Sequence, residues 1–270
     1  MRNVLPKPML AALFAAALSA PCGADVLDDF NAATLIADFQ FDDALGTDIQ
    51  DTLNSANPAA PFDSDVDFAG AATNGTGQFD ASGKDNTQFA TAYSDSAGIA
   101  GGTVYGLFEV SWAFDESIYD PAQDEEFRLS LITFDPRSTF VTAETFFTRT
   151  SATEVEMFGN AVGTGPIDTP AVLFGSSGSL LTILVADLDA DTIELFYSAD
   201  GGASFLSTGA GVLDPDRGVE SLRLVLNEDF SDDRLLIERF AVAHLVPEPS
   251  TAWLAAIAAF ALALGRWWRR

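Results

Sequence analysis

Apolar and polar residues alternate in many short segments between residues 25 and 246 of the chain. In Glu220–Leu226, the side chains of Leu222, Leu224 and Leu226 fall on one face, opposite Ser221 and Arg223. A period of two residues is typical of a β-strand that is buried on one face. The same pattern predicts strands at Thr34–Phe41, Val104–Phe114, Phe127–Phe134, Thr139–Thr148, Glu154–Phe158, Leu180–Leu188, Thr192–Ser198 and Arg234–Leu245.

Turn-forming residues separate these segments, and residues 25–246 show no long apolar stripe with the period of an α-helix. Clusters of Gly, Asp, Asn and Pro between short apolar runs are typical of all-β proteins. We therefore expect one all-β domain, an antiparallel β-sandwich of the jelly-roll kind, over residues 25–246. Its stretch Asp42–Gly102 has a weaker pattern and predicts long loops with a few short strands.

The N-terminus, residues 1–24, has the layout of a secretory signal peptide. Arg2 and Lys7 precede the apolar run Met9–Leu18, and small residues follow as far as Ala24. Ten apolar residues span only ~15 Å as a helix, about half a bilayer, so a permanent anchor is not expected. We expect signal peptidase to cut after Ala24. The alternatives are a buried helix, or a lipoprotein signal at Cys22, the only cysteine.

The C-terminus, residues 247–270, predicts a membrane helix. The segment Thr251–Leu264 contains no charged residue, and a helix from Ser250 to Trp268 would be ~28 Å long, enough to cross a bilayer. Basic residues concentrate on the cytoplasmic side of membrane helices. The body of the protein is therefore expected on the opposite side, with these arginines in the cytoplasm: Arg266, Arg269 and Arg270.

A four-residue motif precedes that apolar segment: Val246, Pro247, Glu248 and Pro249. A Pro-Glu-Pro motif, one apolar helix and a basic end, in this order at the extreme C-terminus, resemble a PEP-CTERM sorting signal. The resemblance covers Val246–Arg270 only. It implies a Gram-negative bacterium whose exosortase processes the tail, and a life linked to extracellular polysaccharide, biofilm or floc. The alternative is a tail anchor that stays uncut.

The chain is strongly acidic. It has 40 Asp and Glu against 13 Lys and Arg, a net formal charge of −27, and all the acidic residues but Glu248 lie in the predicted sandwich. Such a surface repels nucleic acid, whose phosphates require basic partners. The charge does not indicate disorder, because apolar residues make up 48% of the chain and Phe occurs 22 times.

Three predicted strand regions resemble laminin-G-like domains of the concanavalin-A type. They are the opening strand Leu35–Asp43, the hairpin formed by Leu181–Asp187 and Thr192–Tyr197, and the closing strand Leu235–Val242. The resemblance rests on pattern and spreads thinly over residues 34–245. It implies a jelly-roll sandwich of a kind that often binds carbohydrate, and it assigns no residue to a sugar.

One run of alternating carboxylates suggests calcium as a cofactor: Asp187, Asp189 and Asp191. Calcium takes six to eight oxygen ligands, and an EF-hand loop needs Gly at its sixth position and Glu at its twelfth. Those positions hold Thr192 and Ser198 here, so a polar turn is the preferred interpretation. A calcium site shared with a distant loop stays open, and the run Asp63/Asp65/Asp67 is a second place for one.

Two further patterns point to glycosidases. The segment Ser198–Phe205 resembles one Asp-box hairpin of sialidases, but it occurs once, so we interpret it as a turn. Glu154 and Glu156 share a strand face. Laminarinase-type glucanases carry a second Glu where this chain has Phe158, so no catalytic residue is assigned. His244, the only histidine, is expected to be structural.

These observations favour an exported, exosortase-processed protein of the cell surface or extracellular matrix. It would be non-catalytic, with extracellular polysaccharide as its candidate partner. Before processing, the C-terminal helix would hold it in the inner membrane. The alternative is a glycoside hydrolase on the same fold, which would need two carboxyl groups ~5–9.5 Å apart in a cleft.

Overall fold

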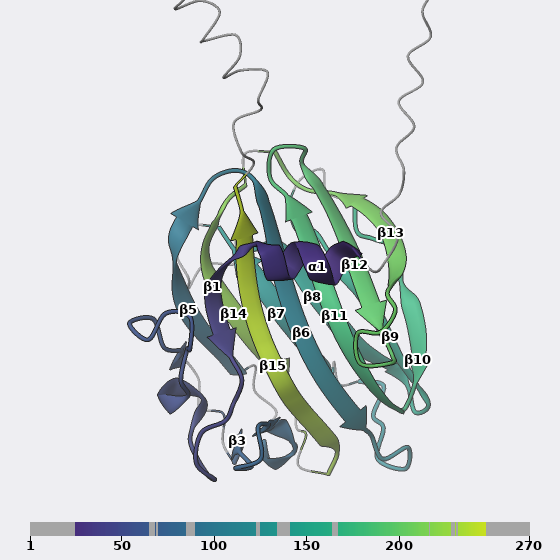
Figure 1. The fold of residues 1–270 in the computed structure, drawn as a ribbon. Coiled ribbons are helices and arrows are strands. Elements are labelled where there is room, and N and C mark those ends of the chain that lie inside the picture. The colour runs from purple at the N-terminus through teal and green to yellow at the C-terminus, as the bar shows by residue number, and fades with distance from the viewer. Residues whose placement is uncertain are drawn as a thin grey trace, which may run out of the picture.

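A computed structural model describes residues 25–64, 68, 70–84, 90–122, 125–133, 141–163, 167–215, 217–227, 230 and 232–246. These residues form a sandwich of two antiparallel sheets (Figure 1). Sheet A has the strand order β13-β12-β11-β6-β15-β4-β3, with β1 also paired to β15. Its strands are β1 Thr34–Phe39, β3 Ala72–Thr73, β4 Phe79–Asp80, β6 Thr103–Ala113, β11 Ser177–Asp187, β12 Thr192–Ser198, β13 Leu206–Val212 and β15 Arg234–Leu245.

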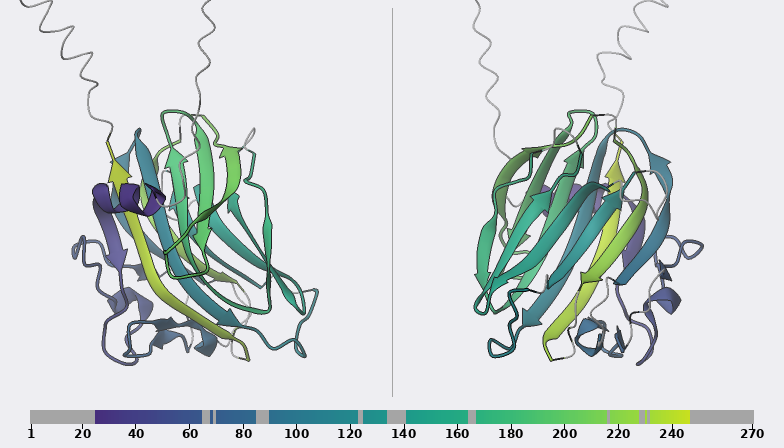
Figure 2. Two further views of the ribbon diagram at one scale, coloured as in Figure 1. Left: turned by 45° about the vertical axis from the view of Figure 1, so that its right-hand side comes forward. Right: turned by 180° about the vertical axis from the view of Figure 1, so that it is seen from behind.

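Sheet B has the order β10-β9-β8-β7-β14-β5-β2 and comes to the front when the molecule is seen from behind (Figure 2, right). Two 3-10 turns, η1 Ile49–Asp51 and η2 Ala81–Gly83, lie in the loops that precede β5. The strands of sheet B are β2 Asp63–Ser64, β5 Ala90–Ile99, β7 Glu126–Ile132, β8 Val141–Ser151, β9 Glu154–Asn160, β10 Val172–Gly175 and β14 Val219–Asn227.

The core between the sheets is rich in phenylalanine. Phe127 and Phe147 stack with ring centroids 4.6 Å apart, and the rings of Phe39 and Phe62 lie 3.9 Å apart. Burying one such ring contributes roughly 1.5–3 kcal/mol. The leucines predicted to face inward on β14 are all in this core, which confirms the alternation in that segment.

All nine predicted segments coincide with strands of the sandwich, and the antiparallel two-sheet fold is confirmed. Arg234–Leu245 has the predicted bounds, whereas Phe134 and Thr139 lie outside the described residues. Six of the described strands lie outside these segments. β2, β3, β4 and β5 fall in Asp42–Gly102, where a few short strands were expected, and β10 and β13 were not predicted. These strands are short or rich in small residues, so their alternation is weak.

A short helix, α1 (Asp25–Ala32), was also not predicted. Its eight residues make only about two turns, too few for a repeated apolar stripe. Val26 and Phe30 are buried, and the helix lies across the outer face of sheet A (Figure 1). The strands and the β12–β13 turn supply the apolar cluster beneath it: Tyr105, Leu107, Leu181, Ile183, Phe196, Phe205, Ala241 and Ala243.

The predicted signal peptide and most of the C-terminal signal lie outside the described residues. Val246 directly follows β15 and is 67% exposed. Among the residues that the structure describes, no helix is both long and apolar enough to cross a membrane. The predicted membrane helix begins beyond them.

Candidate functional site

The outer face of sheet B gathers charged, aromatic and amide side chains from five strands. On β8, Ala143 and Phe147 point into the core, so Glu144 and Phe146 point outward. Strand pairing places Phe146 opposite Phe158 of β9. Hereafter "the sheet B face" means these outward residues: Tyr93, Glu126, Arg128, Ser130, Glu144, Phe146, Glu154, Glu156, Phe158, Asn160 and Arg223.

Glu144 lies at the centre of the sheet B face and is nearly inaccessible, with its side chain 1% exposed. One carboxylate oxygen accepts hydrogen bonds from Arg223 at 2.7 Å and from Ser130 at 2.6 Å. The other accepts from Asn160 at 2.7 Å and from Arg128 at 3.4 Å. Four strands therefore meet at one carboxylate.

These partners keep Glu144 ionised. Burial alone would raise the pKa of its carboxyl group, because a charged group loses hydration. The two guanidinium groups, with the hydrogen bonds from Ser130 and Asn160, outweigh that effect and hold the pKa below its usual value. Glu144 is thus suited to fixing arginines and not to donating a proton at neutral pH.

Beside this network, three side chains form a row across β7, β8 and β9. The Phe146 and Phe158 rings stack with centroids 5.0 Å apart and planes at 28°. The guanidinium carbon of Arg128 lies 4.6 Å from the Phe146 centroid, and Arg128 also pairs with Glu126 at 2.7 Å. Half-buried rings next to fixed hydrogen-bonding groups can bind a ligand that has both apolar and hydroxyl surfaces.

The two carboxylates singled out in β9 lie on the same face, as the alternation predicts. Val155 and Met157 point into the core, so Glu154 and Glu156 point outward with Phe158. Glu154 is exposed and accepts a hydrogen bond from the hydroxyl of Ser151 at 3.3 Å. Glu156 is the nearer of the two to Phe158, two positions away along β9.

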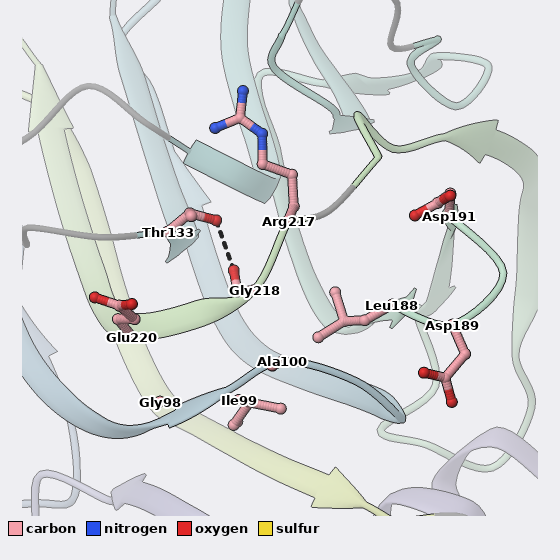
Figure 3. Close-up of a pocket in the computed structure, with 10 residues that line it drawn as sticks. All are labelled: Gly98, Ile99, Ala100, Thr133, Leu188, Asp189, Asp191, Arg217, Gly218 and Glu220. Atoms are coloured by element: carbon pink, nitrogen blue, oxygen red, sulfur yellow. Dashed lines mark hydrogen bonds between the residues drawn. The ribbon is translucent and has the colours of Figure 1, made fainter.

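A separate cavity of about 630 Å³ opens at one end of the sandwich (Figure 3). Its walls come from the β5–β6 turn, the end of β7, the β11–β12 turn and the start of β14. The Thr133 hydroxyl donates to the Gly218 carbonyl at 2.6 Å and ties two of these segments together. The charged residues of the cavity are Asp189, Asp191, Arg217 and Glu220.

The three aspartates considered for calcium divide between two roles. Asp187 accepts hydrogen bonds from the backbone N–H groups of Asp189 and Ala190, both at 3.0 Å, and so fixes the β11–β12 turn. Asp189 and Asp191 line the cavity but point away from each other (Figure 3). In the part of the chain that the structure describes, no three His, Cys, Asp or Glu residues are grouped to hold a metal ion. Asp65 and Asp67 lie outside it.

The Asp-box-like segment is a closed turn between β12 and β13. Asp200 accepts hydrogen bonds from the hydroxyls of Ser198 and Ser204, both at 2.6 Å, and from the Ser204 backbone at 2.9 Å. These bonds lower the pKa of the Asp200 carboxyl group to about 2. Phe205 then packs under α1, which gives the turn a structural role.

The other predicted residues lie elsewhere. Nε2 of His244 is 2.9 Å from the carbonyl oxygen of Gly101, a contact within the fold. Of the sorting motif, the structure describes Val246 alone. Residues outside the described part are Pro247, Glu248, Pro249, Arg266, Arg269 and Arg270.

Sequence reasoning missed the central residues of the sheet B face. Glu144 and Phe146 alternate with core residues in β8, which is a visible signal. Arg128, however, reaches Glu144 from the preceding strand and Arg223 from β14, 79 residues away, so the pairing of β7 with both β8 and β14 is needed to bring them together.

No protein-family model matches the chain, and no curated protein matches it. Among solved structures, the chain is similar to the seed lectin of Lotus tetragonolobus, with 11% identity, 78% of this chain and 99% of that chain covered, and a TM-score of 0.45. It is also similar to the CBM2 module of the evolved Dit of Lactobacillus casei BL23 phage J-1, with 8% identity, coverage of 80% and 98%, and a TM-score of 0.49. A third similar structure is lectin II from Ulex europaeus, with 9% identity, 77% of this chain and 98% of that chain covered, and a TM-score of 0.45. No residue of this chain takes a role from these similarities.

Proposed function

We propose that this chain is an exported protein of the cell surface or extracellular matrix that binds polysaccharide without cleaving it. Signal peptidase removes residues 1–24, and an exosortase processes the tail that begins at Val246–Pro249. The sandwich then lies outside the inner membrane, in a biofilm or floc. The order of charged, apolar and proline-rich segments at the two ends supports export and sorting.

The row of Arg128, Phe146 and Phe158 carries the proposal of sugar binding. Pyranose rings have apolar C–H faces and hydroxyl edges, so they fit sites with a few placed polar groups beside aromatic rings. The row supplies the rings, and Asn160 and Glu156 supply an amide and a carboxylate beside Phe158 on the same strand. Glu144 fixes Arg128 and Asn160 before any ligand arrives, which lowers the cost of ordering them.

Binding is tested with residues 25–246, which contain every described strand. Retention on insoluble glucans, mannans and amino glycans is measured for the unchanged protein and for the double variant Phe146→Ala/Phe158→Ala. We expect the variant to lose on the order of tenfold in affinity. Leu206→Ala is the matched control, since Leu206 is 60% exposed on sheet A. Equal retention of both proteins would refute the role of the row.

The proposal that the protein does not cleave polysaccharide is tested by measuring hydrolysis of glucans. We expect no release of reducing ends from any glucan during long incubation. Hydrolysis that disappears in Glu154→Gln or Glu156→Gln would establish the glycoside hydrolase instead. Glu194→Gln on sheet A serves as the control for a change of charge.

Export and processing need separate measurements. Alkaline phosphatase fused after residue 245 should be active, because it would lie outside the cytoplasm. Mass spectrometry of the released protein should find an end near Pro247–Ser250. Recovery of peptides from Trp253–Arg266 in released protein would argue against processing.

A further inference from the structure

We infer that the glycan bound on the sheet B face carries no anionic groups, and that Glu126 and Glu144 determine this by occupying the face's arginines. The inference rests on the function proposed above and names its ligand class. Arg128 and Arg223 are the two cations of the sheet B face, and each of them pairs with a glutamate.

Both guanidinium groups are already engaged by carboxylates. Arg223 bonds to Glu144 at 2.7 Å, and Arg128 bonds to Glu126 at 2.7 Å and to Glu144 at 3.4 Å. Recognition of a carboxylate or sulfate group ordinarily uses the planar fork of an arginine. A uronate or sulfate on a glycan would have to displace a protein carboxylate, one of which is buried.

The rest of the sheet B face adds negative charge. Glu154 and Glu156 lie on the same strand face as Phe158, where a sugar would stack on the ring. The whole chain has a net formal charge of −27. An anionic polymer is therefore repelled at the contact and also at long range, at least within a Debye length of about 10 Å in 0.1 M salt.

An uncharged glycan meets no such obstacle. Its hydroxyl groups can donate hydrogen bonds to Glu156 and accept them from Asn160 without breaking the pairs of Arg128. Stacking on Phe146 and Phe158 does not depend on charge. Binding of an uncharged glycan should thus vary little with salt, in contrast to binding through ion pairs.

The test compares soluble neutral glucan and mannan with polygalacturonate and alginate, each titrated into residues 25–246 in 20 mM and 200 mM salt. We expect saturable binding of a neutral polymer with similar affinity at both salt concentrations, and no binding of either polyuronate. Binding of a polyuronate as tight as that of a neutral glycan would overturn the inference while leaving polysaccharide binding intact. Failure of all four polymers to bind would overturn both.

Variants locate the cause. Glu126→Gln removes one charge partner of Arg128 and keeps the shape of the side chain. It should raise the ratio of polygalacturonate affinity to neutral-glucan affinity on the order of threefold to tenfold. Glu220→Gln makes the same change of charge at the end cavity and should gain nothing. Equal gains in both variants would show that net charge decides, and would overturn the role of the arginine pairs. If Glu126→Gln does not fold, Glu156→Gln tests the second part of the argument, the charge repulsion next to Phe158, and no gain in polygalacturonate affinity would overturn that part.

Discussion

The outer faces of the two sheets differ in how their buried side chains are stabilised. Sheet A presents an apolar patch and covers it with α1, which buries Phe30. Within the residues that the structure describes, no helix covers the face of sheet B, and its buried charges are neutralised in pairs around Glu144. A large apolar patch needs a cover in a soluble protein, whereas a paired polar face does not. Of the two, the sheet B face is the one that sets paired charges beside stacked, half-buried aromatic rings.

The largest expected effect follows from breaking the pairs on sheet B. Glu144→Ala leaves Arg223 buried without its carboxylate, and uncompensated buried charges cost about 3–5 kcal/mol of stability. Urea unfolding, followed by circular dichroism, measures the loss. Glu154→Ala, on the exposed edge of the same face, should change stability by less than about 0.5 kcal/mol. Similar losses in the two variants would contradict the network.

Removing the cover of sheet A should come next in size. Phe30→Ala deletes the buried aromatic ring of α1, and we expect a loss of about 3 kcal/mol, at the lower end for such changes because a short helix can undock. The variant should also bind a fluorescent apolar dye such as ANS. Leu45→Ala, at a side chain that is 79% exposed, is the control. A stable variant that binds no dye would show that α1 is dispensable.

One carboxyl group on each face should contribute to stability with an opposite dependence on pH. On sheet A, burial and the neighbouring Glu238 raise the pKa of Glu109, against the opposing effect of Arg239. A raised pKa contributes stability below the ordinary value of 4.5, and that contribution is lost as pH rises through the folded-state value. For Glu144 the pKa is lowered, so its contribution is present above 4.5 and is lost as pH falls.

Two variants separate these contributions. From pH 4.5 to 7, Glu109→Gln should become more stable relative to the unchanged protein, because it lacks the contribution that fades. Below pH 4.5, Glu144→Gln should lose less stability than the unchanged protein does. Urea midpoints at intervals of half a pH unit would detect both trends. If the urea midpoints of all three proteins changed in parallel with pH, the opposite pKa shifts of Glu109 and Glu144 would be refuted.

The smallest expected difference concerns cations. Since Asp187 fixes its own turn, we expect diffuse screening of the acidic surface and no specific calcium site at Asp187, Asp189 and Asp191. Melting curves in calcium and sodium at equal ionic strength should coincide. A calcium-only rise of several degrees, reversed by a chelator, would establish a site.

How far the sequence predicts this molecule depends on whether a feature is local. Alternation within one segment located β14 and β15, because a half-buried strand shows its period directly. α1 was missed because two turns show no period, and the amphipathic pattern has meaning only once sheet A lies beneath it. Glu144 was missed for a related reason: its partners Arg128 and Arg223 are set by strand order, which no single segment contains.

The position of β15 has a consequence for the order of folding. This last of the described strands lies inside sheet A, next to β6, and pairs with β1, so that His244 meets Thr34 from the opposite end of the described residues. While the chain is being synthesised, β6 and β1 lack this neighbour until the final strand has emerged. Pairings of such long sequence separation close slowly. Sheet A therefore cannot be completed until β15 has emerged from the ribosome, and the earlier strands stay without their central partner until then.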